Sequence, residues 1–166
     1  MKANKKKINL YLMGYKGLKV LVYFIENSFL DTINSVCVAK DKNVKNDYFE
    51  EISELCKINK LNYFLREKNK DLPEADYSIA VSWRWLISSK SVLIVLHDSI
   101  LPRYRGFLPL VSQLVEGEKE IGVTAILAND NYDEGDIICS SKIQIQYPIN
   151  IFEAIIKISS CYEECI

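Results

Sequence analysis

The chain has 166 residues, of which 49% are hydrophobic and 26% charged, and its formal net charge is −1 at pH 7. This length fits one domain, expected over residues 1–166, and the composition is that of a globular protein able to bury a core. The near-neutral charge excludes the basic excess typical of nucleic-acid-binding proteins, so a nucleic-acid partner is not expected.

Five cysteines and a single histidine decide which redox and metal chemistry to expect. The cysteine count is odd and no Cys-x-x-Cys pair occurs, which favours free thiols in a reducing compartment over disulfides. Because His97 is the sole histidine, no metal site is expected. The first 25 residues show no signal peptide or membrane span, so the predicted location is the cytoplasm, with no membrane partner.

Apolar runs and helically spaced apolar residues alternate along the chain. In chain order they predict a strand over 8–13, a turn over 14–17, a helix over 18–26, a strand over 33–39, a helix over 47–59 and strands over 61–65, 76–82 and 92–96. The remainder predicts a helix over 107–116, strands over 123–128 and 137–145, and a helix over 151–165. The expected fold is therefore a Rossmann-like, doubly wound α/β domain with a mostly parallel sheet, helices on both faces and one late strand pairing antiparallel at an edge.

Two polar loops follow the fifth and sixth predicted strands. Residues 96–106 hold the only histidine with an aspartate, a serine and two arginines, and residues 129–136 hold four carboxylates. Ligands of open α/β sheets bind beyond the carboxyl ends of the strands, so both loops are candidate site segments. A carboxylate beside a histidine favours the imidazolium, which can stabilise an oxyanion or move a proton. From composition alone, a structural histidine and a solvated acidic turn stay open as alternatives.

The order of residues in these loops resembles the formyltransferase family. His97 is followed by Ser-Ile-Leu-Pro at 99–102, Arg-Gly at 105–106, Gly-Val-Thr at 122–124 and Asp-Glu-Gly at 133–135, in the order of that family's motifs. The family includes glycinamide ribonucleotide, methionyl-tRNA and sugar N-formyltransferases, and the resemblance extends more loosely over most of the chain. It implies a formyltransferase core that uses N10-formyltetrahydrofolate as cosubstrate.

The resemblance also assigns roles residue by residue. His97 matches the catalytic histidine, which would stabilise the tetrahedral oxyanion, and Asp133 matches the aspartate that would hold the histidine charged and assist proton transfer. The residues matching parts that bind the cosubstrate are Trp83, Arg84, Trp85, Leu86, Ile87, Ala128, Asn129, Asp130 and Tyr132. The substrate-binding candidates are Gly14, Tyr15, Lys16, Arg103, Arg105 and Gly106. Core or lid packing for the tryptophans, loop bracing for Arg105 and simple solvation for Arg103 stay open as alternatives.

One position departs from the family pattern. The family's asparagine, two residues before the histidine, falls at Val95, and valine cannot donate a hydrogen bond to the formyl oxygen. The loss of one oxyanion donor typically costs about a hundred- to a thousandfold in rate. Either a substitute donor exists, with Asp98, Ser99 or Asn129 as candidates, or the protein is a catalytically impaired folate-binding module.

The formyl acceptor is expected to be a small-molecule amine, most consistent with an amino-sugar nucleotide. The 14–17 segment is bulkier than the Gly/Ser-rich phosphate loop of glycinamide ribonucleotide enzymes. The chain also ends without the basic C-terminal domain of methionyl-tRNA enzymes, which disfavours tRNA. Proteins like those two enzymes, and a nucleotide-binding α/β domain unrelated to folate, remain alternatives, and a homodimer is left open.

Overall fold

The computed structural model describes residues 5–68 and 72–166, and it divides between Leu93 and Ile94 into two units. The expectation of one domain over 1–166 stays a prediction. The first unit carries the parallel strands that a Rossmann-like fold requires, and the second unit carries both polar loops singled out in the sequence.

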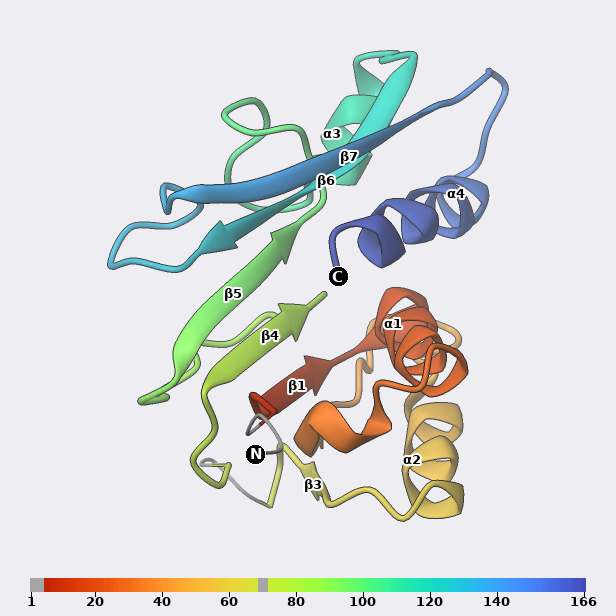
Figure 1. The fold of residues 1–166 in the computed structure, drawn as a ribbon. Coiled ribbons are helices and arrows are strands. Elements are labelled where there is room, and N and C mark those ends of the chain that lie inside the picture. The colour runs from red at the N-terminus through yellow and green to blue at the C-terminus, as the bar shows by residue number, and fades with distance from the viewer. Residues whose placement is uncertain (1–4, 69–71) are drawn as a thin grey trace. The chain divides into compact units, whose positions relative to one another are not determined.

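Strand β1 (Ile8–Leu12) forms the middle of the first unit's sheet (Figure 1). It pairs in parallel with β2 (Ile33–Val38) on one side and with β4 (Tyr77–Val81) on the other, and β3 (Tyr63–Leu65) extends the sheet beyond β2. The helices of this unit are α1 (Gly14–Glu26), the short 3-10 helix η1 (Leu30–Thr32) and α2 (Phe49–Ile58).

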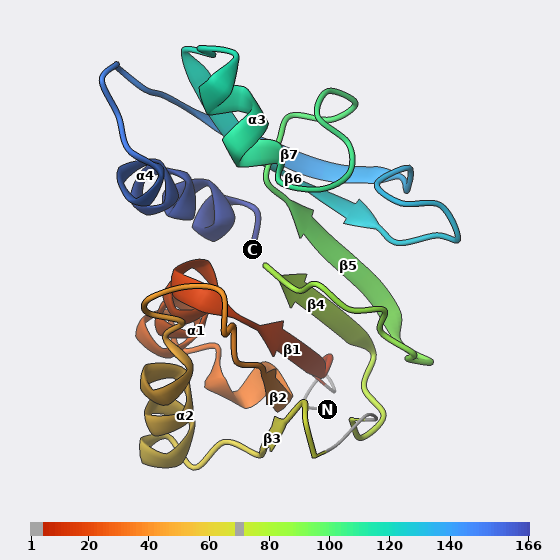
Figure 2. The same ribbon diagram turned by 180° about the vertical axis from the view of Figure 1, so that it is seen from behind.

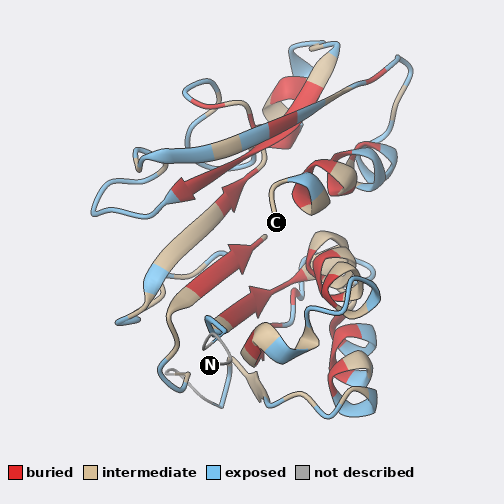
Figure 3. Cartoon of the chain, in the orientation of Figure 1, coloured by how far each residue is buried: buried red, intermediate tan, exposed pale blue. Residues whose placement is uncertain are grey.

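The core of the first unit follows from its apolar patterning. Strands β1, β2 and β4 are buried along most of their length, as expected for parallel strands covered by helices. Helix α1 turns Val20, Leu21 and Phe24 inward, and it lies beside α2 in both views (Figures 1 and 2). Figure 3 shows the buried residues concentrated on these strands and on the inner faces of the helices.

The turn predicted over 14–17 is wrong, because α1 begins at Gly14, directly after β1. Gly14 has a φ of +69°, which lets the chain bend sharply out of the strand. A Cβ at Gly17 would lie 3.2 Å from the Cβ of Leu12, so a glycine here allows the first helical turn to pack against the strand end. The two glycines therefore make a close strand-to-helix connection rather than a separate turn.

The second unit is built on antiparallel pairs. Strand β5 (Val92–His97) pairs antiparallel with β6 (Glu120–Leu127), which pairs antiparallel with β7 (Ile137–Gln144). The expectation of an antiparallel strand late in the chain is confirmed. Its helices are α3 (Pro109–Val115) and α4 (Ile151–Glu164), and α4 contacts β6, β7 and α3.

Helix α4 begins at a capping box. The Asn150 side chain accepts a hydrogen bond from the Glu153 amide, and the Glu153 carboxylate accepts one from the Asn150 amide. The helix then buries Ile158 and Tyr162 completely against the sheet. No helix among the described residues is long and apolar enough to span a bilayer.

All five cysteines are free thiols, as the sequence predicts. Cys37, Cys56 and Cys161 are buried. Burial disfavours the thiolate, and it raises the pKa of Cys37 to about 11 and that of Cys56 to about 12. These thiols are therefore protonated in the folded protein at neutral pH.

The raised pKa of Cys56 predicts a loss of stability in alkali. The protonated Cys56 thiol contributes fully to stability below pH 9.0, the ordinary pKa of a thiol. This contribution is lost as the pH rises towards about 12, because in that range only the unfolded chain releases the proton. We expect the free energy of unfolding in urea to fall more steeply between pH 9 and 11 for the native chain than for Cys56→Ala. Each protein is normalised to its own value at pH 7, and equal slopes would contradict the prediction.

Candidate active site

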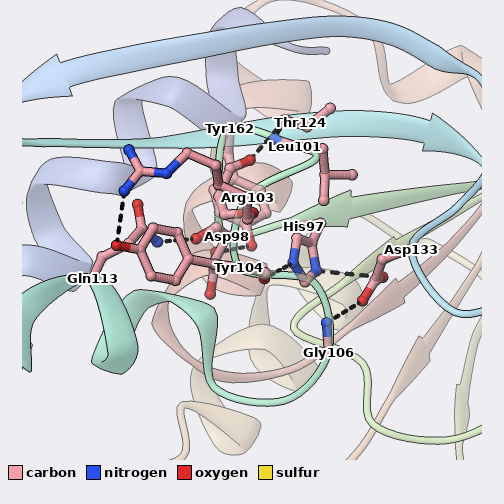
Figure 4. Close-up of polar contacts among 11 residues, drawn as sticks. His97, Asp98, Leu101, Arg103, Tyr104, Gly106, Gln113, Thr124, Asp133 and Tyr162 are labelled. Carbon is pink, nitrogen blue, oxygen red and sulfur yellow. Dashed lines mark hydrogen bonds and ion pairs between the residues drawn. The ribbon is translucent and has the colours of Figure 1, made fainter. Parts of the chain in front are cut away.

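His97 is the last residue of β5 and is buried at the start of the first polar loop. Its Nε2 atom lies 2.8 Å from the carbonyl oxygen of Tyr104, and its Nδ1 atom lies 3.4 Å from Oδ1 of Asp133 in the second polar loop (Figure 4). The structure therefore brings together the two residues expected to be catalytic. All three groups belong to the second unit.

The two contacts of His97 specify where its protons lie. A carbonyl oxygen only accepts hydrogen bonds, so Nε2 must carry a proton in the contact with Tyr104. Nδ1 lies at ion-pair distance from the Asp133 carboxylate. A proton on each ring nitrogen would match both neighbours, since each presents oxygen lone pairs.

Asp133 is itself held by the main chain of the first loop. Its Oδ2 atom accepts a hydrogen bond of 2.8 Å from the amide of Gly106. Gly106 has a φ of +92°, a conformation that favours glycine. Next to this contact, Nη1 of Arg105 lies 3.3 Å from Oε1 of Glu134. The Arg-Gly pair of one loop thus binds the Asp-Glu pair of the other, which agrees with loop bracing by Arg105.

Two glycines allow the chain to approach itself closely around this site. A Cβ at Gly135 would lie 1.6 Å from the carbonyl oxygen of Leu127, which no side chain could tolerate. A Cβ at Gly122 would lie 2.3 Å from the carbonyl oxygen of Ser141. The glycine of the Asp-Glu-Gly motif therefore lets the second loop fold back on the end of β6, which brings Asp133 to His97.

Thr124 fixes the beginning of the first loop from the neighbouring strand. It lies opposite His97 in the β5–β6 register. Its hydroxyl donates to the carbonyl oxygen of Ser99 at 2.6 Å and accepts from the amide of Leu101 at 3.1 Å. The Ser99 side chain is fully buried, and its hydroxyl donates to the carbonyl oxygen of Arg103 at 2.7 Å. The loop is therefore held by buried hydrogen bonds along its length.

Asp98 is held by two helices. The Tyr162 hydroxyl in α4 donates to its carboxylate at 2.5 Å, and the Gln113 amide in α3 donates to its main-chain carbonyl at 2.7 Å. Gln113 and Tyr162 are both buried. These contacts connect the residue next to His97 with both helices of the second unit.

Val95 lies two residues before His97 in β5, so the two side chains share a face of the strand. An aliphatic group thus stands on the histidine face where the family pattern has an amide. Three residues were candidates to replace the family's asparagine as hydrogen-bond donor, and each has a partner within the chain. Ser99 bonds to Arg103, Asp98 to Tyr162, and Asn129 donates to the carbonyl oxygen of Glu134 at 3.2 Å. A role for any of them as hydrogen-bond donor to the substrate stays a prediction.

The cosubstrate-binding candidates 83–87 lie in the first unit, directly after β4. The ring of Trp83 packs edge-on against Tyr11, with centroids 5.2 Å apart, and against Trp85 at 5.3 Å. The Arg66 guanidinium stacks on the other tryptophan, 3.8 Å from the ring centroid of Trp85. Both tryptophans therefore have aromatic packing partners, while Leu86 is 85% exposed.

Three further groups of candidate residues remain: Arg84, the first turn of α1 and residues 128–132. The first two have partners in the first unit, and the third is exposed. Arg84 forms an ion pair of 2.6 Å with Asp41, whose carboxylate is buried. Gly14, Tyr15 and Lys16 form the first turn of α1, where Tyr15 packs against Tyr48 at a centroid distance of 5.3 Å. In the second unit, residues 128–132 are all exposed and accessible to a ligand.

Sequence reasoning missed Tyr104, Gln113 and Tyr162. Tyr104 contacts His97 through a main-chain carbonyl, which no residue type reveals. Gln113 and Tyr162 carry polar groups on the buried faces of α3 and α4, and a polar residue at an apolar helical position was the only signal for them. Among the described residues, no group of three or more His, Cys, Asp or Glu side chains could hold a metal ion.

Known proteins resemble this chain in sequence and in structure. The family model described as formyl transferase matches residues 59–150. The methionyl-tRNA formyltransferase of Hydrogenobaculum sp. (strain Y04AAS1) is 38% identical over 94 residues, covering 52% of this chain and 30% of the relative. The chain thus spans about a third of the length of the curated relatives it matches.

Two solved structures share the fold. A sugar 3N-formyl transferase crystallised in the presence of dTDP and 5-N-formyl-THF has a TM-score of 0.75 at 20% identity, covering 98% of this chain and 61% of its own. The phosphoribosylglycinamide formyltransferase of Bacillus halodurans has a TM-score of 0.72 at 15% identity, covering 96% and 90%. The expected Rossmann-like α/β fold class is confirmed.

The close approach at Gly135 predicts a selective loss of stability. We expect Gly135→Ala to lower the free energy of unfolding by about 3 kcal/mol or more, because its Cβ would collide with the Leu127 carbonyl. Gly117→Ala is the matched control: its Cβ meets open space and its φ of +73° adds only backbone strain, about 1 kcal/mol. Urea unfolding of both variants measures the difference, and equal losses would refute the steric explanation.

Proposed function

The chain belongs to the formyl transferase family, and from that premise we propose that its His97–Asp133 pair catalyses transfer of a formyl group from N10-formyltetrahydrofolate to an amine. The observation that carries the proposal is the ion pair of 3.4 Å between Nδ1 of His97 and Oδ1 of Asp133. It joins the only histidine of the chain to the acidic loop, and its partners are largely shielded from water.

The chemistry of the pair suits acyl transfer. The formyl donor supplies an electrophilic carbon, whose oxygen gains negative charge as an amine nitrogen attacks it. An imidazolium at His97 can stabilise that charge electrostatically, since its two N–H groups already face Tyr104 and Asp133. Asp133 can take the proton that the attacking amine releases, and the N10 nitrogen of tetrahydrofolate takes up a proton as its bond to the formyl carbon breaks.

The residues around the pair fit this reaction in one respect and depart from it in another. The exposed residues 128–132 offer main-chain groups next to Asp133 that could hold the cosubstrate, as the family resemblance implies. Val95, on the histidine face of β5, offers no hydrogen-bond donor. We therefore propose an enzyme whose oxyanion stabilisation depends on His97 more strongly than the family pattern requires.

The acceptor we favour is an amino-sugar nucleotide in the cytoplasm. A sugar 3N-formyl transferase shares the fold over nearly the whole chain. The sequence has no basic excess for binding tRNA. The sequence relatives include methionyl-tRNA formyltransferases, and a phosphoribosylglycinamide formyltransferase shares the fold. Methionyl-tRNA and glycinamide ribonucleotide therefore belong in any acceptor panel beside amino-sugar nucleotides.

Removal of either catalytic side chain is expected to abolish most formyl transfer. With N10-formyltetrahydrofolate and the acceptor panel, His97→Ala and Asp133→Asn should lower the rate of tetrahydrofolate release by about 10²- to 10⁴-fold, the usual contribution of acid–base groups. Asp136→Asn is the matched control, an exposed carboxylate of the same loop, and should keep the native rate. Turnover unchanged in His97→Ala would sink the proposal.

An amide at position 95 is expected to increase the rate. Val95→Asn places a donor on the histidine face of β5 and should raise kcat by roughly 100-fold, the typical contribution of one oxyanion donor. Val95→Leu changes the side chain without adding a donor and should give no gain. If the native chain binds folate in calorimetry without turnover and only Val95→Asn turns over, the impaired folate-binding alternative holds instead.

A further inference from the structure

Tyr104 holds an uncommon backbone conformation at the point where it contacts the histidine. Its φ is +59°, in the left-handed region that costs free energy for any residue other than glycine. In this conformation its carbonyl oxygen lies 2.8 Å from Nε2 of His97. Something in the surrounding structure must therefore stabilise Tyr104 in this conformation.

The stabilising contacts come from the side chain of the same residue. The Tyr104 hydroxyl lies 2.6 Å from Oε2 of Glu116 and 2.7 Å from Oε1 of Glu118, which flank the turn between α3 and β6. A phenol has one proton and donates to one carboxylate at a time. Arg103 supplies the compensating charge: its Nη2 atom donates to the Tyr104 hydroxyl at 3.2 Å and forms an ion pair with Glu118.

The charges of this cluster keep the phenol protonated. The hydrogen bonds to Glu116 and Glu118 raise the pKa of the Tyr104 phenol well above its ordinary value of 10.0. The hydrogen bonds from Tyr104 and Arg103 lower the pKa of the Glu118 carboxyl, so this acceptor stays ionised. Donor and acceptor are thus each held in the protonation state that the contact needs.

We propose that Tyr104 is a positioning residue for His97, in which the clamp of its hydroxyl on Glu116 and Glu118 aims its main-chain carbonyl at Nε2. The carbonyl fixes a proton on Nε2 and orients the ring, so that Nδ1 is the nitrogen presented to Asp133. This inference deepens the proposed formyl transfer and rests on it for the kinetic effect alone.

The clamp of the Tyr104 hydroxyl on Glu116 and Glu118 does more than stabilise the turn between α3 and β6. Tyr147 also binds this turn, because its hydroxyl lies within hydrogen-bond distance of the carbonyl oxygens of Glu118 (3.0 Å) and Leu114 (3.3 Å) and donates to one of them at a time. In the part of the chain that the structure describes, these hydrogen bonds of Tyr147 go to the turn and not to the loop that carries Tyr104. Tyr147→Phe therefore loosens the same turn without releasing the carbonyl from His97, which makes it the matched control for Tyr104→Phe.

The first test observes the histidine directly and needs no turnover. Because the chain has one histidine, its imidazole gives one set of signals in ¹H–¹⁵N NMR. In the native chain and in Tyr147→Phe we expect a slowly exchanging proton on Nε2. In Tyr104→Phe that proton should exchange too fast to be observed. A protected Nε2 proton that persists in Tyr104→Phe overturns the proposal.

The second test separates positioning from binding. Tyr104→Phe should lower kcat by roughly 10- to 100-fold, the scale expected for a misaligned catalytic group, and leave the KM for N10-formyltetrahydrofolate within twofold. Glu116→Gln/Glu118→Gln keeps oxygen acceptors for the phenol and should behave as the native chain, whereas Glu116→Ala/Glu118→Ala removes both acceptors and should follow Tyr104→Phe. A change in KM with kcat preserved would contradict the assignment, as would equal effects of Tyr104→Phe and Tyr147→Phe.

The two tests distinguish failure of this inference from failure of the proposed function. If the native chain shows no turnover with any acceptor, the NMR comparison still decides the role of Tyr104. If Tyr104→Phe unfolds, Glu116→Ala/Glu118→Ala replaces it in both measurements, because it removes both acceptors of the clamp and leaves the tyrosine in place. A protected Nε2 proton in that variant likewise overturns the proposal.

Discussion

The site depends on one buried imidazole whose two nitrogens each face an oxygen acceptor. Nε2 of His97 faces a main-chain carbonyl and Nδ1 faces the Asp133 carboxylate. The lone pairs of these oxygens would repel the lone pair of an unprotonated ring nitrogen. The remaining loop contacts serve this arrangement, since Asp133 is held by the Gly106 amide and the start of the first loop by Thr124.

Main-chain geometry brings the acidic loop to the histidine. Gly135 allows the chain to fold back on the carbonyl of Leu127, and Gly106 adopts a positive φ where its amide binds Asp133. The glycines of the family motifs therefore have a steric explanation that is separate from chemistry. They determine whether the carboxylate reaches the imidazole, and the side chains then determine what the pair can do.

Val95 and Asp98 show how this chain differs from the family pattern. Val95 places an aliphatic group on the histidine face of β5. The Asp98 carboxylate accepts a hydrogen bond from Tyr162, and the Asp98 main-chain carbonyl accepts one from Gln113. Asp98 therefore connects the site to α3 and α4. The chain has an aliphatic group where the family pattern has an amide, and next to the histidine it carries a carboxylate that contacts its own helices.

The sequence by itself determined the alternation of strands and helices and the free thiols, because apolar periodicity and cysteine spacing are local properties of the chain. The pairing of His97 with Asp133 was expected only from the family resemblance, because it joins two loops that are far apart in the sequence. The sequence did not determine that α1 starts at Gly14, since that depends on how closely Gly17 can approach Leu12. Nor could it reveal the carbonyl of Tyr104 as a partner of the imidazole. Every residue has a carbonyl, and only the tertiary structure decides which one points at a given nitrogen.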